Sequence, residues 1–140
     1  MGPNKIACIG GGYWGKNLIR NFSDLEVLAW ICEIDSDRRA RLGATYPTAR
    51  LTDDVHQVLA DPEVAGVVIA TPAETHGELV REALLAGKDV FVEKPLCLSV
   101  EEGQQLVGCT VASWPAVQGS GAGEGSFLQA EAHLVTQCVP

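Results

Sequence analysis

The sequence predicts a single α/β domain in which parallel strands alternate with helices. Three observations lead to this prediction. The chain of 140 residues is long enough for one domain with a core. Short apolar runs alternate along it with helix-forming stretches, and most of these runs are continuously apolar rather than alternating with polar residues. Continuous apolar strands are typical of a parallel sheet that helices cover on both faces.

The composition is that of an ordinary globular protein and argues against several kinds of partner. Apolar residues make up 46% and charged residues 20%, and the formal net charge is −8. This charge argues against nucleic acid or an anionic membrane surface as a partner. No apolar run reaches the roughly 18 residues of a membrane span, and no signal peptide is visible. The five cysteines form no CxxC pair, which predicts a cytoplasmic protein without a disulfide framework or a metal site.

The first strand is predicted at residues 5–10, an apolar run that ends in glycine. A helix is expected to follow at once, because Trp14, Leu18 and Phe22 are four residues apart and form one apolar face. We expect this face, Trp14 included, to pack towards the sheet. Phe91, in the last predicted strand, is likewise expected in the core.

Further apolar runs are predicted as strands at residues 27–34, 49–51, 65–71 and 89–93. Helices are expected after them, with Ser36 and Thr52 as N-caps of two of these helices. Gly87 fits the C′ position that ends the helix before the last strand. Ser99 and Glu102 suit a capping box for a final helix.

Three glycines with the spacing G-x-G-x-x-G lie between the first predicted strand and helix: Gly10, Gly12 and Gly15. In this motif the first glycine permits a tight turn, the second lets a pyrophosphate approach the backbone, and the third lets helix and strand pack closely. Glu33 ends the second predicted strand roughly 20 residues later, where an acid accepts hydrogen bonds from the adenosine ribose. We interpret this as the dinucleotide-binding turn of a Rossmann fold. An ordinary strand–helix turn without a ligand is the alternative.

The acid at residue 33 also bears on the choice of coenzyme. A carboxylate near the 2′ position would repel the phosphate of NADP, so NAD is favoured and NADP is less expected. Arg38 follows closely and weakens this preference, unless it belongs to a solvated helix face. FAD fits less well, because Ile19 stands where FAD proteins usually have Gly or Ala.

Three segments, KIACIGGGYWGKNLIRNF, ICEID and VVIATPAETHGELVREALLAGKDVFVEKPL, together closely resemble the Gfo/Idh/MocA family of oxidoreductases. The resemblance covers about residues 4–107. Its most specific part combines Thr71-Pro72, His76 and Glu93-Lys94-Pro95 at the ends of consecutive strands. This combination is far more specific than the glycine motif alone.

The resemblance implies an NAD(P)-dependent dehydrogenase that transfers hydride between a nicotinamide coenzyme and a secondary hydroxyl of a sugar, nucleotide sugar or cyclitol. Lys94 would be catalytic, since family members use this lysine to bind or activate the reacting hydroxyl, often next to a cis peptide before the proline. Coenzyme contacts are expected from the glycine loop and the strand ends: Gly10, Gly12, Tyr13, Trp14, Gly15, Glu33, Arg38, Thr71, Pro72, His76, Glu93 and Lys94.

The end of the chain departs from the family pattern. Family members continue with another strand and a second α/β domain that supplies an Asp/His pair for proton transfer. We expect the dinucleotide-binding domain to span residues 4–107, with its last helix ending at Val107. Residues 108–140 are expected to form a poorly specified tail, disordered in part or aberrant as after a truncation or frame change. A non-catalytic NAD(H)-binding module or an inactive truncated homologue is the alternative to an active dehydrogenase, and a homo-oligomer stays open.

Overall fold

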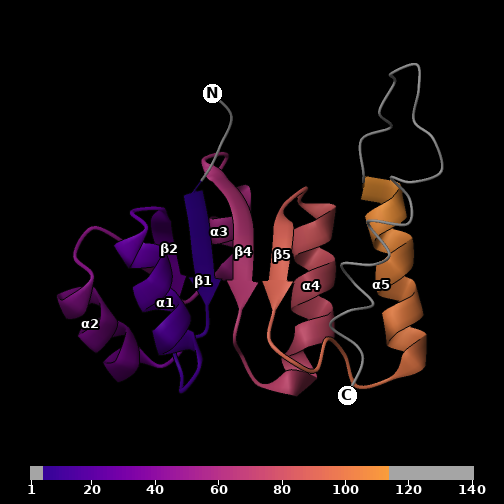
Figure 1. Cartoon of the computed structure of the whole chain (residues 1–140), viewed down its shortest axis with the longest axis horizontal. Coiled ribbons are helices and arrows are strands. Elements are labelled where there is room, and N and C mark those ends of the chain that lie inside the picture. The colour runs from indigo at the N-terminus through magenta and orange to yellow at the C-terminus, as the bar shows by residue number, and fades with distance from the viewer. Residues whose placement is uncertain (1–4, 114–140) are drawn as a thin grey trace.

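A computed structural model describes residues 5–113 and contains one parallel sheet of five strands (Figure 1). The strands are β1 (Lys5–Ile9), β2 (Leu28–Cys32), β3 (Arg50–Thr52), β4 (Val64–Ile69) and β5 (Asp89–Val92). They lie in the order β3-β2-β1-β4-β5, and every neighbouring pair is parallel. This is the doubly wound Rossmann arrangement that the sequence predicts.

Helices connect the strands in the predicted alternation. They are α1 (Gly15–Asp24), α2 (Ser36–Thr45), α3 (Val55–Ala60), a 3₁₀ turn η1 (Ala73–Thr75), α4 (His76–Leu85) and α5 (Val100–Ser113). The last helix continues to Ser113, beyond its predicted end at Val107. The rest of the predicted tail, residues 114–140, lies outside the described residues.

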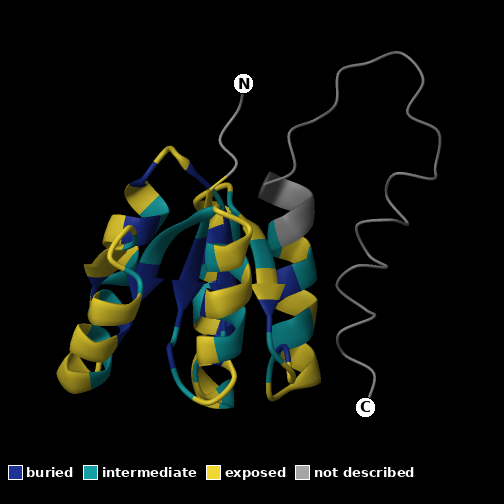
Figure 2. Ribbon diagram, turned by 60° about the vertical axis from the view of Figure 1, so that its left-hand side comes forward, coloured by how far each residue is buried: buried dark blue, intermediate teal, exposed yellow. Residues whose placement is uncertain are grey.

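The core has two layers, one on each face of the sheet. Side chains along a strand alternate between faces, so Cys8 of β1 packs with Ile19 of α1, whereas Ile9 packs with Val58 of α3 and Val80 of α4. Helices α1 and α2 therefore cover one face, and α3, α4 and α5 cover the other. Figure 2 shows the buried residues between sheet and helices and the exposed residues on the outer helix surfaces.

Two predicted N-caps are displaced along the chain. Asp35, not Ser36, caps α2, because its backbone is extended and its carboxylate accepts the N–H of Arg38 at 2.7 Å. Asp54, not Thr52, caps α3 in the same way, and the Thr52 hydroxyl instead accepts the N–H of Asp54 at 3.0 Å. Ser, Thr and Asp are all good caps, so their type alone does not say which of several neighbours takes the position.

The C-terminus of α4 is as predicted. Gly87 has φ +73° and occupies C′. Its N–H donates to the carbonyl of Leu84, and the N–H of Lys88 donates to the carbonyl of Ala83, both at 3.0 Å. These two bonds form a Schellman motif, for which a left-handed glycine is favoured.

The start of α5 differs in one detail from the predicted capping box. The Ser99 hydroxyl accepts the N–H of Glu102 at 3.1 Å, as expected. The Glu102 carboxylate, however, accepts the N–H of Leu98 rather than that of the cap residue. The box is therefore half formed, with the acid reaching one residue further back along the chain.

Two aromatic side chains that were expected in the core are exposed. Trp14 is 62% exposed because α1 begins at Gly15, and the buried face of that helix centres on Ile19. Phe91 is 46% exposed because β5 is an edge strand of the sheet. Its side chain lies on the same face of the sheet as Val68, which α1 and α2 cover. These two helices follow β1 and β2, which are not neighbours of β5 in the strand order.

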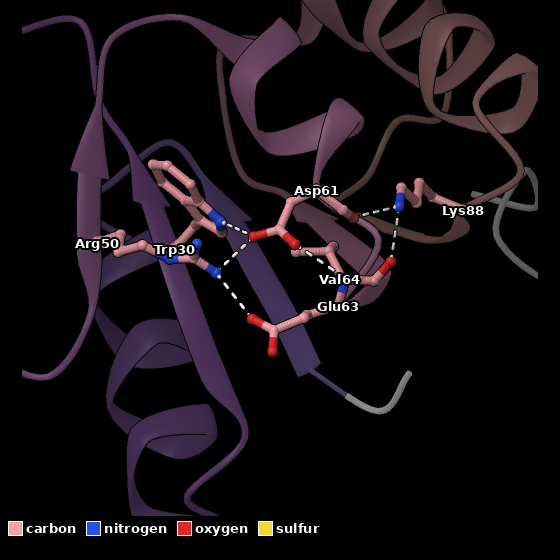
Figure 3. Close-up of polar contacts among 6 residues, drawn as sticks. All are labelled: Trp30, Arg50, Asp61, Glu63, Val64 and Lys88. Carbon is pink, nitrogen blue, oxygen red and sulfur yellow. Dashed lines mark hydrogen bonds and ion pairs between the residues drawn. The ribbon is translucent and has the colours of Figure 1, made fainter. Parts of the chain in front are cut away.

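Asp61 organises a polar cluster at the amino edge of the sheet (Figure 3). Its carboxylate accepts the indole N–H of Trp30 at 2.7 Å and pairs with Arg50, whose guanidinium lies 4.5 Å from the centre of the Trp30 ring. The ammonium of Lys88 donates to the carbonyls of Asp61 and Val64, each at 2.8 Å. The hydrogen bond from Trp30 is the largest of the influences that hold the pKa of Asp61 below its usual range. This cluster links β2, β3 and the start of β4 near the amino ends of the strands, away from their carboxyl ends.

Within residues 5–113, no helix combines the length and apolar character that crossing a membrane would require.

Candidate functional site

The glycine loop between β1 and α1 combines two packed positions with one open position. Gly10 has φ +93°, and a Cβ there would lie 2.7 Å from the carbonyl oxygen of Ala70. A Cβ on Gly15 would collide with the carbonyl oxygen of Gly10. A Cβ on Gly12, in contrast, would meet nothing within 4 Å. The loop therefore needs Gly10 and Gly15 for its own packing and leaves room for a ligand beside Gly12, which is the arrangement that suits a pyrophosphate.

Glu33 fastens this loop to the end of β2. Its carboxylate is 4% exposed and accepts the N–H of Gly11 at 2.8 Å and the N–H of Asp35 at 2.9 Å. A Cβ on Gly11 would collide with Leu42 and crowd this carboxylate. The sequence did not predict that Gly11 and Asp35 would bind the Glu33 carboxylate through their N–H groups. The run of three glycines was the one sign that Gly11 has a special position.

Arg38 of α2 covers the Glu33 carboxylate at 3.2 Å and is itself 42% exposed. Burial tends to raise the pKa of Glu33, but the hydrogen bonds from the Asp35 and Gly11 N–H groups and from Arg38 outweigh it and hold that pKa below its usual range. The acid is therefore ionised at neutral pH. A ligand that approaches it meets the guanidinium as well as the carboxylate.

Tyr13 and Trp14 lie exposed beside the loop, 75% and 62% respectively. Their rings meet edge to face with centroids 5.4 Å apart, and the Lys16 ammonium lies 5.2 Å from the centre of the Tyr13 ring. Two exposed aromatic rings at the start of α1 offer a surface for a planar or apolar ligand group.

The loop after β4 contains Thr71 and Pro72 and is held by internal hydrogen bonds. The Thr75 hydroxyl donates to the carbonyl of Pro72 at 2.7 Å, and the hydroxyls of Thr71 and Thr75 lie 2.7 Å apart. A Cβ on Gly10 would lie 3.1 Å from the methyl group of Thr71. The β4 loop therefore abuts the glycine loop.

The loop after β5 carries Glu93, Lys94 and Pro95. The N–H of Glu93 donates to the carbonyl of Ile69 at 3.0 Å, and the Lys94–Pro95 peptide is cis, as the family resemblance implies. Lys94 is exposed, and its ammonium makes no hydrogen bond or ion pair with the other residues that the structure describes. It is therefore available to a ligand.

His76 lies beneath these loops rather than at their surface. Its ring is 1% exposed, Nδ1 lies 2.6 Å from the Pro95 carbonyl and Nε2 lies 2.7 Å from the Thr71 carbonyl. The ring is therefore buried under the loops that follow β4 and β5, and both of its nitrogens face backbone carbonyls.

The predicted residues come together at the carboxyl edge of the sheet, at the lower end of the strands in Figure 1. The loops follow β1, β4 and β5, and Glu33 follows β2. The strand order reverses between β1 and β4, and ligands of doubly wound sheets bind in the crevice at such a switch point.

Comparison with known proteins agrees with this geometry. Scyllo-inositol 2-dehydrogenase (NAD(+)) of Bacillus subtilis (strain 168) is 34% identical over 96 residues, which cover 67% of this chain and 27% of that protein. The crystal structure of GenD2 from gentamicin A biosynthesis in complex with NAD aligns with a TM-score of 0.74 at 31% identity, covering 81% of this chain and 33% of that chain. The WlbA dehydrogenase of Bordetella pertussis, in complex with NADH and UDP-GlcNAcA, aligns with a TM-score of 0.71 at 25% identity, covering 79% and 34%.

The chain thus spans about a third or less of the length of these relatives. A model of the oxidoreductase family with an NAD-binding Rossmann fold, GFO_IDH_MocA, matches residues 4–113. With the fold, the strand-end loops and this match in agreement, the chain belongs to the Gfo/Idh/MocA family of NAD(P)-binding oxidoreductases.

Proposed function

We propose that this chain is the coenzyme-binding part of a dehydrogenase that transfers hydride between NAD and a secondary hydroxyl of a sugar, nucleotide sugar or cyclitol. One observation carries the proposal. The open side of Gly12 lies in a loop that abuts Thr71. The loop after β5 follows at the same edge of the sheet, and its Lys94 ammonium has no hydrogen-bond or ion-pair partner among residues 5–113. The similarity to a scyllo-inositol 2-dehydrogenase and to a dehydrogenase solved in complex with UDP-GlcNAcA supports the substrate class.

The adenosine half of the coenzyme is assigned to the glycine loop and the end of β2. Backbone N–H groups at the start of α1 would hold the pyrophosphate at Gly12, aided by the helix dipole. Glu33 would accept from the adenosine ribose, which favours NAD, while Arg38 partly offsets its charge and reduces the discrimination against NADP. Tyr13 and Trp14 would flank the coenzyme from the side of α1.

The nicotinamide half is assigned to the loops after β4 and β5. Thr71, Pro72 and Glu93 would line its position, and the bound nicotinamide would supply the hydride chemistry. Lys94 would contact the reacting hydroxyl, because a cation beside that oxygen stabilises the alkoxide that develops as hydride leaves. It is the catalytic residue of the proposal.

A second function is favoured by the exposure of Lys94. Among residues 5–113 nothing pairs with its ammonium or shields it from water, and exclusion of water strengthens such electrostatic catalysis. A non-catalytic NAD(H)-binding module is therefore the alternative.

Fluorescence titration with NADH and NADPH tests the binding claim, and reduction of NAD⁺ in the presence of myo-inositol or UDP-sugars tests the chemistry. We expect saturable binding with NADH preferred. Arg38→Ala should widen that preference, whereas Arg41→Ala, at an exposed position of the same helix, should leave it unchanged. Lys94→Met should keep NADH binding and abolish turnover. Binding without turnover for any substrate favours the module, and no binding at millimolar coenzyme refutes both functions.

A further inference from the structure

His76 connects the two loops on which the nicotinamide half of the coenzyme is proposed to rest. It is the first residue of α4 and is 1% exposed. One ring nitrogen contacts the carbonyl of Thr71 in the loop after β4, and the other contacts the carbonyl of Pro95 in the loop after β5. A carbonyl oxygen only accepts, so a neutral ring donates one of these bonds and a doubly protonated ring donates both.

The loop after β5 has few other polar attachments. Its last ladder-type bond runs from the N–H of Glu93 to the carbonyl of Ile69. Pro95 has no N–H. Among the residues that the structure describes, the contact between the Pro95 carbonyl and the His76 ring is the only polar contact of the Lys94 and Pro95 backbone. Leu96, 3% exposed, then anchors the chain in the core. The backbone that carries Lys94 is thus attached to the body of the domain by the hydrogen bond between the Pro95 carbonyl and the buried His76 ring.

The same ring relates Lys94 to the pyrophosphate turn. Thr71 abuts Gly10 of the glycine loop, the carbonyl of Thr71 contacts His76, and the other side of the His76 ring contacts Pro95, next to Lys94. This series of contacts spans the carboxyl ends of β1, β4 and β5. Because both ring nitrogens face the protein and the ring is buried, His76 acts on a ligand only through the loops that it joins.

We propose that His76 is a positioning residue that holds the Lys94 loop against the Thr71 loop and so shapes the nicotinamide side of the coenzyme site. The inference rests on the proposed function. It predicts a specific pattern of binding: loss of His76 weakens the part of the affinity that comes from the nicotinamide half and leaves the adenosine half unchanged. ADP carries the adenosine and pyrophosphate groups alone, so it separates the two halves.

Asparagine and glutamine test the two contacts separately. The amide nitrogen of Asn can take the place of Nδ1 and keep the bond to Pro95, whereas that of Gln can take the place of Nε2 and keep the bond to Thr71. By calorimetric titration, His76→Gln should bind NADH about tenfold more weakly, the effect of losing one buried hydrogen bond. Its affinity for ADP should stay within about twofold of the wild type. His76→Asn should retain more of the NADH affinity than His76→Gln. His56→Gln, at a site 74% exposed on α3, is the matched control and should change neither affinity.

Three outcomes overturn the inference. A folded His76→Gln that binds NADH as the wild type does removes the positioning role, and so does an equal loss of affinity for ADP and NADH. The proposed role requires a ring proton on Nδ1, so an NMR coupling across the hydrogen bond from Nδ1 to the Pro95 carbonyl is expected in the unsubstituted chain. Its absence overturns the inference even where the Gln variant does not fold. A wild-type chain that binds NADH no more tightly than ADP refutes instead the proposed function on which the inference rests.

Discussion

Substitution of Gly12 by valine separates ligand binding from folding. A Cβ at Gly12 meets nothing within 4 Å, and the residue is not among the glycines with positive φ. The free energy of unfolding should therefore change by less than about 1 kcal/mol. The valine side chain would fill the space beside the turn and deny the pyrophosphate its backbone hydrogen bonds. Two such charge-assisted bonds at about 1.5 kcal/mol each correspond to a loss of more than 100-fold in NADH affinity.

Gly15→Ala is the contrasting variant. Its Cβ would collide with the Gly10 carbonyl, so overpacking should cost about 1–3 kcal/mol and lower Tm by on the order of 10 °C. Gly108→Val, whose Cβ also meets open space, is the control and should bind NADH normally. Thermal unfolding followed by circular dichroism and NADH titration by fluorescence measure the two effects. A Gly12→Val chain that binds NADH like the wild type would refute the assignment of the turn.

Three further predictions concern stability and reactivity. The folded-state pKa of Asp61 is lowered, chiefly by the hydrogen bond from Trp30, so its ionised form stabilises the fold above the usual carboxyl pKa and this contribution is lost as the pH falls through the folded pKa. In urea unfolding between pH 7 and pH 2, the free energy of unfolding should therefore depend less on pH for Asp61→Asn than for the wild type, and parallel curves would contradict this. Burial raises the thiol pKa of Cys8 to about 12 and that of Cys32 to about 11, so mass spectrometry should find both unalkylated by iodoacetamide at pH 8 until urea is added, and labelling of the folded chain is the contrary result. Glu26 has φ +58°, so Glu26→Gly should raise the free energy of unfolding by up to about 1 kcal/mol, and a loss of stability contradicts the strain.

The order of elements and the place of the site could be predicted because they depend on patterns that few alternatives satisfy. Continuous apolar runs predicted the parallel strands. The steric reasons for glycine at positions 10 and 15 are confirmed, because a Cβ at Gly10 would clash with the Ala70 carbonyl and one at Gly15 with the Gly10 carbonyl. The glycine spacing also identified the loop at which the strand order reverses. These features depend on local sterics and on the strand period, which a single sequence displays.

What could not be predicted depends on which neighbour a side chain meets. The spacing of Trp14 suggested a buried face, but the helix begins one residue later, and the residue lies outside it. Phe91 looks like core until the sheet order makes β5 an edge. His76 could be placed at the site but not beneath it, because the carbonyls that it contacts belong to residues brought together only by the fold. Likewise, nothing in the sequence pairs Glu33 with the N–H of Gly11.

The central claim is that a nicotinamide dinucleotide binds along the carboxyl edge of the sheet. Mapping of backbone amide NMR shifts during titration with NADH tests it most directly. The account predicts saturable shifts at Gly10–Gly15, at Glu33 and at Thr71 and Lys94, with the amides around Asp61 and Lys88 at the opposite edge unchanged. Shifts confined to that opposite edge, or no shifts at millimolar NADH, would contradict it.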